Sequence, residues 1–338
     1  MNEFSFSTKL FFGEGSLGRL RSIKGKRVLV ITDSFIYNCG TAQKVEKYLA
    51  NCKVTYFKDV VPDPPVEVIS AGIKSLIKAE AEVLIAIGGG SALDSAKAIK
   101  SMAEQIYPEK IRICEFVAIP TTSGTGSEVT DLAIITDKES NIKFPLQGAE
   151  LRPCTAILDP TLVLSAPPSV TADTGMDVLT HAIEAYVSNG ATDFSDALAE
   201  KAAALVMEFL PLVYKNGGNI LAREKMHNAS CMAGLAFNSA GLGLTHGISH
   251  ALGAHLHIPH GRARRVFRYC LRTIRRFYSK DDKQLCGYSH RSSCNDNFYN
   301  DVRHLSDKNG YTALNSLHIA MVLLVKQGLQ QKLLQPLF

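Results

Sequence analysis

The chain contains 338 residues, of which 46% are hydrophobic and 20% are charged. This balance is typical of a globular protein and excludes a disordered chain, and no apolar run reaches the roughly 18 residues that a membrane-spanning helix needs. The net charge of +5 is unevenly distributed, because residues 261–338 contain fourteen Lys and Arg against five Asp and no Glu.

Length, N-terminal sequence and cysteine usage indicate a cytoplasmic protein of two domains. A chain of this length exceeds one ordinary core. The first ten residues, MNEFSFSTKL, lack the basic and apolar regions of a secretory signal. The eight cysteines form no C-x-x-C pair, which favours reduced thiols over a disulfide framework.

The first half of the chain alternates apolar, β-rich runs with helical patterns. Strands are predicted over 26–33, 53–60, 81–90 and 114–122, and helices over 41–50, 65–80 and 91–105. This alternation is typical of a parallel sheet of the nucleotide-binding kind. We therefore expect a dinucleotide-binding α/β domain over residues 1–165.

From about Ser169 the apolar period becomes helical. Helices are predicted over 177–187, 194–214 and 222–241. The change follows the proline-containing stretch LDPTLVLSAPPSV, residues 158–170. We expect a helical domain over 166–262, followed by an atypical basic tail over 263–338.

Two glycine segments compete as the phosphate-binding loop. Gly13-x-Gly15-x-x-Gly18 has the spacing of the dinucleotide fingerprint, but it opens the chain after a short strand, so a structural turn is favoured. The segment IAIGGGSALDSAKAIK, residues 85–100, leads from a buried strand through three glycines into a helix, with Ser91 as its N-cap. Backbone N–H groups and the helix dipole there suit a pyrophosphate, although a tight turn needs no ligand.

Polar residues also follow the neighbouring strands. Asp33 ends the strand at 26–33, where its carboxylate would bind an adenosine ribose and repel a 2′-phosphate, favouring NAD over NADP. The alternative role for Asp33 is a helix N-cap. The segment PTTSGTGSEVT, residues 120–130, places hydroxyl groups and glycines at the end of the next strand. This composition suits a cofactor crevice, and an ordinary polar loop is the alternative.

Histidines and an aspartate occur at spacings that suit a metal site. Asp177 and His181 are four apart in a predicted helix and therefore share one face. A later segment holds five histidines, which are His246, His250, His255, His257 and His260. Imidazole and carboxylate ligands suit a catalytic divalent cation, whereas a lone histidine is more often a hydrogen-bonded core residue. Spacing alone does not choose among the five.

Four ordered segments carry a family resemblance. GGGSALDSAKA, AIPTTSGTGSEVT, TGMDVLTHAIEAY and AGLGLTHGISHALGAHLHIPHG resemble the iron-containing (group III) alcohol dehydrogenases, over residues 5–261. The resemblance implies an α/β domain followed by an all-α metal-binding domain of dehydroquinate synthase-like architecture. The segments FKDVVPDPPVEV, DFSDALAEKAAALV and KMHNAS are most similar to the branch of the family from propanediol-utilisation microcompartments.

The resemblance also implies the site residues. The metal ligands would be Asp177, His181, His246 and His260, for Fe²⁺ or for Zn²⁺, because imidazole suits both ions. His250 would lie beside the nicotinamide and relay the proton. The NAD(H) contacts implied are Asp33, Gly89, Gly90, Ser91, Thr121, Thr122, Thr125, Thr130 and Lys143. Residues 13–18 become a structural turn.

The function implied is NAD-dependent interconversion of a short primary alcohol and its aldehyde, with propionaldehyde and 1-propanol as the expected pair. The metal would polarise the substrate oxygen while a hydride passes between carbon and nicotinamide. The expected partners are the small alcohol or aldehyde, a second copy in a homodimer, and shell or enzyme proteins of a bacterial microcompartment. Neither a membrane nor nucleic acid is expected.

On these motifs the resemblance ends near Gly261, where the basic tail begins. A shifted reading frame, a truncated gene or an acquired nucleic-acid-binding domain would each account for the tail, and the lack of a binding motif weighs against the last. Loss of packing helices would leave an inactive remnant that binds nucleotide or a partner. A dehydroquinate synthase-like lyase is a further alternative. Such an enzyme would need a basic phosphate pocket in the helical domain, and the sequence shows none there.

Overall fold

The computed structural model describes residues 4–139, 142–243 and 246. They all belong to one compact unit of the chain. The basic tail expected over 263–338 lies outside the described residues. No helix among those described is long and apolar enough to cross a bilayer.

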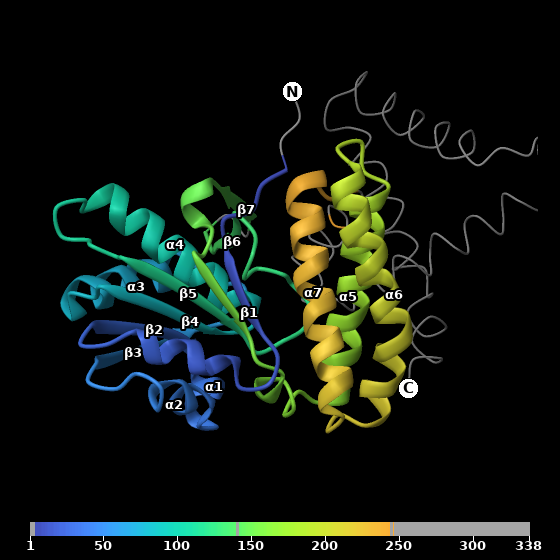
Figure 1. The fold of residues 1–338 in the computed structure, drawn as a ribbon. Helices are drawn as coiled ribbons and strands as arrows, with labels where there is room; N and C mark the ends of the chain where they lie inside the picture. The colour runs from blue at the N-terminus through green and yellow to red at the C-terminus, as the bar shows by residue number, and fades with distance from the viewer. Residues whose placement is uncertain (1–3, 140–141, 244–245, 247–338) are drawn as a thin grey trace, which may run out of the picture. The chain divides into compact units, whose positions relative to one another are not determined.

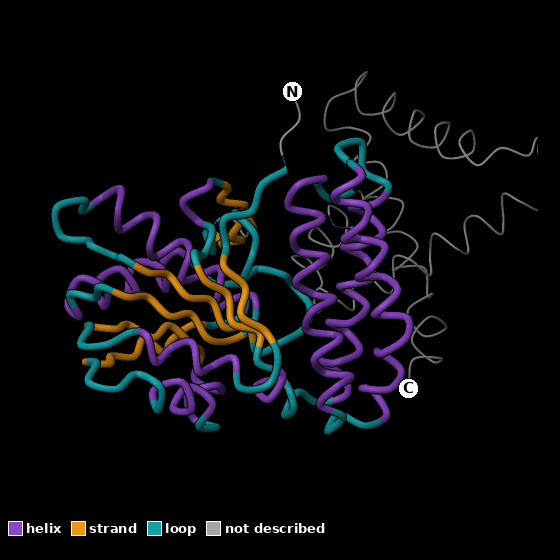
Figure 2. The backbone as a smooth tube through the Cα atoms, in the orientation of Figure 1, coloured by secondary structure: helices purple, strands orange, loops and turns teal. Residues whose placement is uncertain are grey.

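A six-stranded parallel sheet organises the N-terminal part of the chain (Figures 1 and 2). Its strands are β1 (Lys9–Phe12), β2 (Arg27–Asp33), β3 (Lys53–Val60), β4 (Val83–Gly88), β5 (Glu115–Pro120) and β8 (Thr155–Leu158). Their order across the sheet is β1-β8-β5-β4-β2-β3. A separate antiparallel hairpin consists of β6 (Leu132–Asp137) and β7 (Ile142–Gln147).

Helices cover both faces of this sheet because alternate strand residues point to opposite faces. Leu29 and Ile31 of β2 pack in a cluster with residues of α3 (Val66–Ala79) and α4 (Gly90–Ile106). Val28 and Val30 pack on the other face with α1 (Ser34–Asn38), α2 (Thr41–Glu46) and the 3-10 turn Ser16–Ser22. Burial on both faces explains why the central strands are continuous apolar runs.

Three long helices follow the sheet. They are α5 (Pro168–Tyr186), α6 (Asp193–Lys215) and α7 (Ile220–Ala240). Small side chains let them pack closely, since nine of the buried residues in their common core are alanines of these helices: Ala182, Ala185, Ala199, Ala202, Ala222, Ala229, Ala233, Ala236 and Ala240. The first of these helices carries the predicted pair Asp177 and His181.

The observed order confirms the predicted α/β sheet followed by helices. The predicted strand at 53–60 has the observed bounds, and the other predicted strands and helices of the sheet differ by a few residues at their ends. The short strand expected before Gly13 is β1, whereas strands β6, β7 and β8 were not predicted. The helix predicted over 177–187 begins nine residues earlier, at Pro168, because proline is well tolerated in the first turn of a helix.

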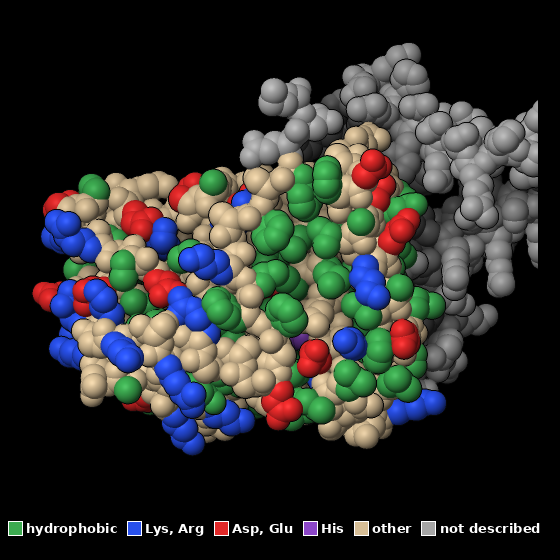
Figure 3. All heavy atoms as spheres, in the orientation of Figure 1, with side chains coloured by type: hydrophobic (Ala, Val, Ile, Leu, Met, Phe, Trp, Pro, Cys, Tyr) green, Lys and Arg blue, Asp and Glu red, His purple; other side chains and the backbone are tan. Residues whose placement is uncertain are grey.

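An apolar groove of about 550 Å³ lies where β1 and the N-terminal residues meet α6 and α7. Among its lining residues, Phe6 is 49% exposed, Phe12 65% and Phe194 67%. Figure 3 shows hydrophobic side chains gathered between the sheet and the three helices, whereas Lys and Arg gather over the sheet part of the same face. The groove adjoins β1, which is an edge strand of the sheet.

Candidate metal centre and cofactor crevice

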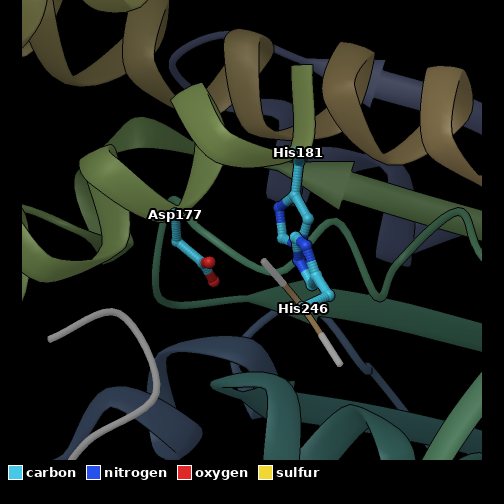
Figure 4. A group of neighbouring side chains, drawn as sticks. All are labelled: Asp177, His181 and His246. Carbon is cyan, nitrogen blue, oxygen red and sulfur yellow. The ribbon is translucent and has the colours of Figure 1, made fainter. Parts of the chain in front are cut away.

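Asp177, His181 and His246 form a buried cluster of metal-ligand type (Figure 4). One carboxylate oxygen and one nitrogen from each ring lie within 4.8 Å of one another. Helix α5 supplies Asp177 and His181 on one face, and His246 follows α7. The three side chains are 4–5% exposed. One carboxylate and two imidazoles are a donor set that suits iron or zinc.

Neighbouring residues fix the orientation of the two imidazole rings. The His181 ring stacks between Phe237 and His246, at centroid distances of 4.5 and 4.7 Å. Nδ1 of His246 is hydrogen-bonded to Glu184 Oε2, which also accepts a hydrogen bond from Gly243 N at 3.0 Å. A carboxylate at the second ring nitrogen is the usual support for a metal-bound histidine, and it directs Nε2 of His246 toward the cluster.

The carboxyl ends of β2 and β4 lie side by side at the point where the chain changes direction across the sheet, and we call the region beside them the candidate cofactor crevice. After β2 the chain adds β3 on one side, and β4 then pairs on the other side of β2. Such a switch point is the usual ligand site of a doubly wound sheet. Asp33 Oδ2 would be 3.4 Å from a Cβ atom added at Gly88, so the predicted ribose ligand and the glycine turn are neighbours.

The turn after β4 leaves little room for side chains. Gly88 has φ +154, and a Cβ there would lie 2.6 Å from Ala92 Cβ. At Gly90 an added Cβ would lie 2.7 Å from Thr125 Cγ2. Helix α4 begins at Gly90, so its first N–H groups face the crevice with the positive end of the helix dipole. Gly89, and not the predicted Ser91, is the N-cap of α4, and the backbone at Gly89, Gly90 and Ser91 is compatible with the predicted pyrophosphate cradle.

Asp33 fulfils the alternative role of a helix N-cap, since its Oδ1 accepts a hydrogen bond from Ile36 N at 2.8 Å and caps α1. Of the hydroxyl residues, Thr121 N donates to Gly88 O at 2.9 Å, and Thr122 lies 3.6 Å from the position of a Cβ at Gly89. These contacts bring residues 121 and 122 to the glycine turn. The predicted cofactor residues from three strand ends are therefore adjacent.

The loop after β5 also touches the metal-bearing helix. A Cβ added at Gly124 would lie 2.8 Å from Thr174 Cβ and 3.3 Å from its Cα. Thr174 is on α5, three residues before Asp177. Only a residue without a side chain fits there, so the loop from the cofactor crevice reaches the helix within one turn of the metal cluster.

Two predicted cofactor residues have protein partners of their own. Thr130 is 3% exposed, and its hydroxyl accepts a hydrogen bond from Lys97 Nζ at 2.9 Å. Lys143, on β7, forms an ion pair of 2.6 Å with Asp63, which follows β3. The predicted residues His250 and His260 lie outside the described residues, as do His255 and His257.

Buried charges beneath the loop were not predicted from the sequence. Lys97 is fully buried, donates to Leu132 O at 2.8 Å, and has its pKa lowered to about 8, because burial outweighs the attraction of Asp94 and Glu128. Burial raises the pKa of Glu128 to about 7. Asp94 accepts hydrogen bonds from Ser127 Oγ and Ile134 N, and burial raises its pKa. These residues tie α4 to the loop and to β6.

The first glycine segment is a turn filled by the protein itself. Gly13 and Gly15 have φ values of +91 and +83, which glycine adopts readily. The backbone N–H groups of Gly15 and Leu17 donate to Asp159 Oδ2 at 3.1 and 3.3 Å. An internal carboxylate thus takes the place that a phosphate would need, in agreement with the prediction of a structural turn.

Comparison with known families gives two matches that together span most of the chain. The family described as "Iron-containing alcohol dehydrogenase" matches residues 7–160, and "Fe-containing alcohol dehydrogenase family, C-terminal" matches residues 171–309. The second match continues past Gly261, so the sequence motifs placed the end of the resemblance too early.

Curated relatives are similar over comparable lengths. The chain is 44% identical to 1-propanol dehydrogenase PduQ of Citrobacter freundii over 332 residues, covering 97% of this chain and 85% of that protein. It is 47% identical to PduQ of Salmonella typhimurium over 278 residues, covering 82% and 74% respectively.

Solved structures agree with the fold. Sulfoacetaldehyde reductase from Bifidobacterium kashiwanohense in complex with NAD⁺ superimposes with a TM-score of 0.74 at 33% identity, covering 79% of this chain and 74% of that one. A 1,3-propanediol oxidoreductase gives a TM-score of 0.73 at 33% identity, with the same coverage.

Proposed function

The chain belongs to the iron-containing alcohol dehydrogenase family, and we propose that it interconverts 1-propanol and propionaldehyde with NAD(H). The observation that carries this proposal is the convergence of Asp177, His181 and His246 within 4.8 Å. 1-Propanol is the alcohol named for its PduQ relatives, and propionaldehyde is the aldehyde that its oxidation gives. We expect the protein to catalyse the same reaction on other short primary alcohols.

The residues present fit a divalent iron. Asp177, His181 and His246 would hold it, and we propose His260 as the fourth ligand from the family resemblance. Bound iron would supply Lewis-acid polarisation of the substrate oxygen. Glu184 orients His246 through Nδ1, and the burial of all three side chains excludes water from the cluster.

The crevice fits an NAD molecule, which would exchange the hydride. Its pyrophosphate would lie over Gly89, Gly90 and Ser91, at the N-terminus of α4. Asp33 would accept hydrogen bonds from the adenosine ribose and disfavour a 2′-phosphate by charge repulsion. We assign Thr121, Thr122 and Thr125 to the adjoining wall, with Thr130 and Lys143 as outer contacts. His250 would stand beside the nicotinamide and pass on the proton.

We further propose that the protein is a homodimer and works inside a bacterial microcompartment. The support for the dimer is the apolar groove beside the edge strand β1, with exposed Phe6, Phe12 and Phe194. The support for the microcompartment is the resemblance to the propanediol-utilisation branch. Sedimentation of the purified chain tests whether it is a dimer, and co-purification with microcompartment shells tests its location.

The test of the activity uses the full chain, purified and loaded with Fe²⁺ under anaerobic conditions. We expect propionaldehyde-dependent oxidation of NADH that is lost on chelation and restored by Fe²⁺. The inactive variant for comparison is Asp177→Asn, which keeps the side-chain shape but removes the charge. We expect its turnover to fall at least about a thousandfold. Stoichiometric iron and tight NADH binding without turnover on any short aldehyde would instead indicate the inactive remnant.

A further inference from the structure

His227 is a buried polar residue that the proposed reaction does not use. It lies on α7, is 1% exposed, and its Nδ1 is 3.0 Å from Ser123 Oγ. Burial lowers its pKa to about 4, against the opposing effects of Asp159 and of a hydrogen bond to the carbonyl of Pro120. The ring is therefore neutral near pH 7, and one of its contacts is to the hydroxyl of Ser123.

The two residues that face His227, Pro120 through its backbone and Ser123 through its hydroxyl, stand at the two ends of the segment that holds candidate cofactor residues. Pro120 ends β5, and Ser123 comes three residues later. Between them are Thr121, whose N–H donates to Gly88 O, and Thr122, which lies against Gly89. The hydrogen bond between Ser123 Oγ and His227 Nδ1 holds the end of this four-residue turn against α7 and so restricts the position of its two central residues.

Further contacts of the same loop lie along one face of α7. A Cβ added at Gly234 would be 2.9 Å from Gly126 O and 3.0 Å from Gly126 Cα, so helix and loop touch backbone to backbone. Asn238 Oδ1 accepts a hydrogen bond from Asp131 N at 2.9 Å. The positions 227, 234 and 238 are separated by seven and four residues, which places them on one helical face. The chain then continues from α7 to His246.

Stability alone does not account for an imidazole at this position. An apolar side chain would fill the same space without a desolvation cost, whereas a buried polar group is tolerated where its hydrogen bonds define one arrangement. The arrangement defined here is that of the 120–123 turn relative to the helix that precedes a metal ligand.

We infer that His227 is a positioning residue, which holds the Thr121–Thr122 turn in the geometry that accepts the nicotinamide cofactor. This inference rests on the proposed function, because it takes the crevice to be an NAD site. Without the Ser123 contact the turn would populate other conformations, and the apparent affinity for NADH would fall in proportion to the competent fraction.

The test measures NADH binding directly, by titrating the fluorescence of NADH with the iron-loaded protein. The chain contains no Trp, so the nicotinamide signal is read without energy transfer from an indole. We compare the wild type with His227→Leu, Ser123→Ala and the double variant. The loss of one buried hydrogen bond predicts an increase in Kd of about five- to tenfold in each single variant, with no further increase in the double variant. His227→Asn places an amide at the position of Nδ1 and should restore most of the affinity.

The matched control is Val206→Ala. Val206 is 1% exposed in the core of the three helices, so its truncation lowers the melting temperature without touching the turn. If the Kd of His227→Leu changes no more than that of this control, whatever its melting temperature, the positioning role is overturned and His227 is a structural core histidine. If His227→Leu fails to fold, Ser123→Ala alone decides by the same criterion. Failure of the wild type itself to bind NADH would overturn the proposed function, and the positioning role with it.

Discussion

The buried imidazole of His227 predicts that the protein loses stability as the pH falls from 7 to 5. Burial lowers its pKa from 6.5 to about 4 in the folded protein, whereas the unfolded chain regains the ordinary value of about 6.5. Between these values the unfolded chain binds a proton that the folded chain does not. The free energy of unfolding therefore rises with pH through this window, and this contribution to stability is lost as the pH falls.

The magnitude follows from the two pKa values. Each pH unit inside the window changes the free energy of unfolding by up to about 1.4 kcal/mol. Since the proton is taken up by the unfolded chain mainly below pH 6.5, the contribution of His227 between pH 7 and pH 5 is about 2 kcal/mol. A loss of this size is a substantial part of the roughly 5–15 kcal/mol that stabilises a domain.

The assay is urea unfolding, followed by circular dichroism, of the wild type and His227→Leu at pH 7 and pH 5. Leucine does not titrate, so we expect the wild type to lose about 2 kcal/mol more than the variant between the two pH values. Other titrating groups, Glu128 among them, are common to both proteins and cancel in the difference. Equal losses in the two proteins would refute the reasoning, since they would show that the folded state carries His227 with its ordinary pKa.

Three further predictions concern other residues. Glu184→Gln should lower the affinity for Fe²⁺ by about 10- to 100-fold, measured by competition with a chelator, and an unchanged affinity would mean that Glu184 does not orient His246. Asp33→Ser keeps an oxygen to cap α1 and should raise the use of NADPH relative to NADH by about tenfold, equal to about 1.4 kcal/mol. The ratio of the kcat/KM values for the two cofactors measures this change. A ratio equal to that of the wild type would count against Asp33 as the ribose ligand. Burial raises the pKa of Glu128 to about 7, so the folded state retains a proton that the unfolded state releases between pH 4.5 and 7, and stability falls as the pH rises. Glu128→Gln should therefore be about 3 kcal/mol more favourable relative to the wild type at pH 8 than at pH 4, and urea unfolding with no such difference would contradict a buried, protonated carboxyl group.

The fold was predictable from the sequence wherever burial determined the residue pattern. Strand β4, VLIAIG, is buried at all six positions, and a short apolar run that ends in glycine is typical of a central strand. Strand β1 has only four residues, with two exposed positions, so its sequence predicts a short strand but not its place in the sheet. That place is set by β8, which is distant along the chain and pairs with it from Lys9 opposite Thr155 to Phe12 opposite Leu158.

The candidate site was predictable in part, for a similar reason. Helical spacing places Asp177 and His181 on one face, but the choice of His246 among five histidines came from the family resemblance. Glu184 was missed because the ring that it orients, that of His246, is distant along the chain. His227 and the buried Lys97 could not be assigned from a single sequence, because their partners, Ser123 and Thr130, are distant along the chain.

The pairing of β1 with β8 has a consequence for how the protein emerges from the ribosome. The turn after β1 closes only when Asp159 accepts hydrogen bonds from residues 144 and 142 positions earlier. At about 5–20 residues per second, the nascent chain carries this apolar segment unpaired for roughly ten to thirty seconds. Over that interval the segment KLFF is a template for association with other chains. We therefore expect the yield of native protein in a cell to depend on chaperone supply and translation rate more than the stability of the finished fold would suggest.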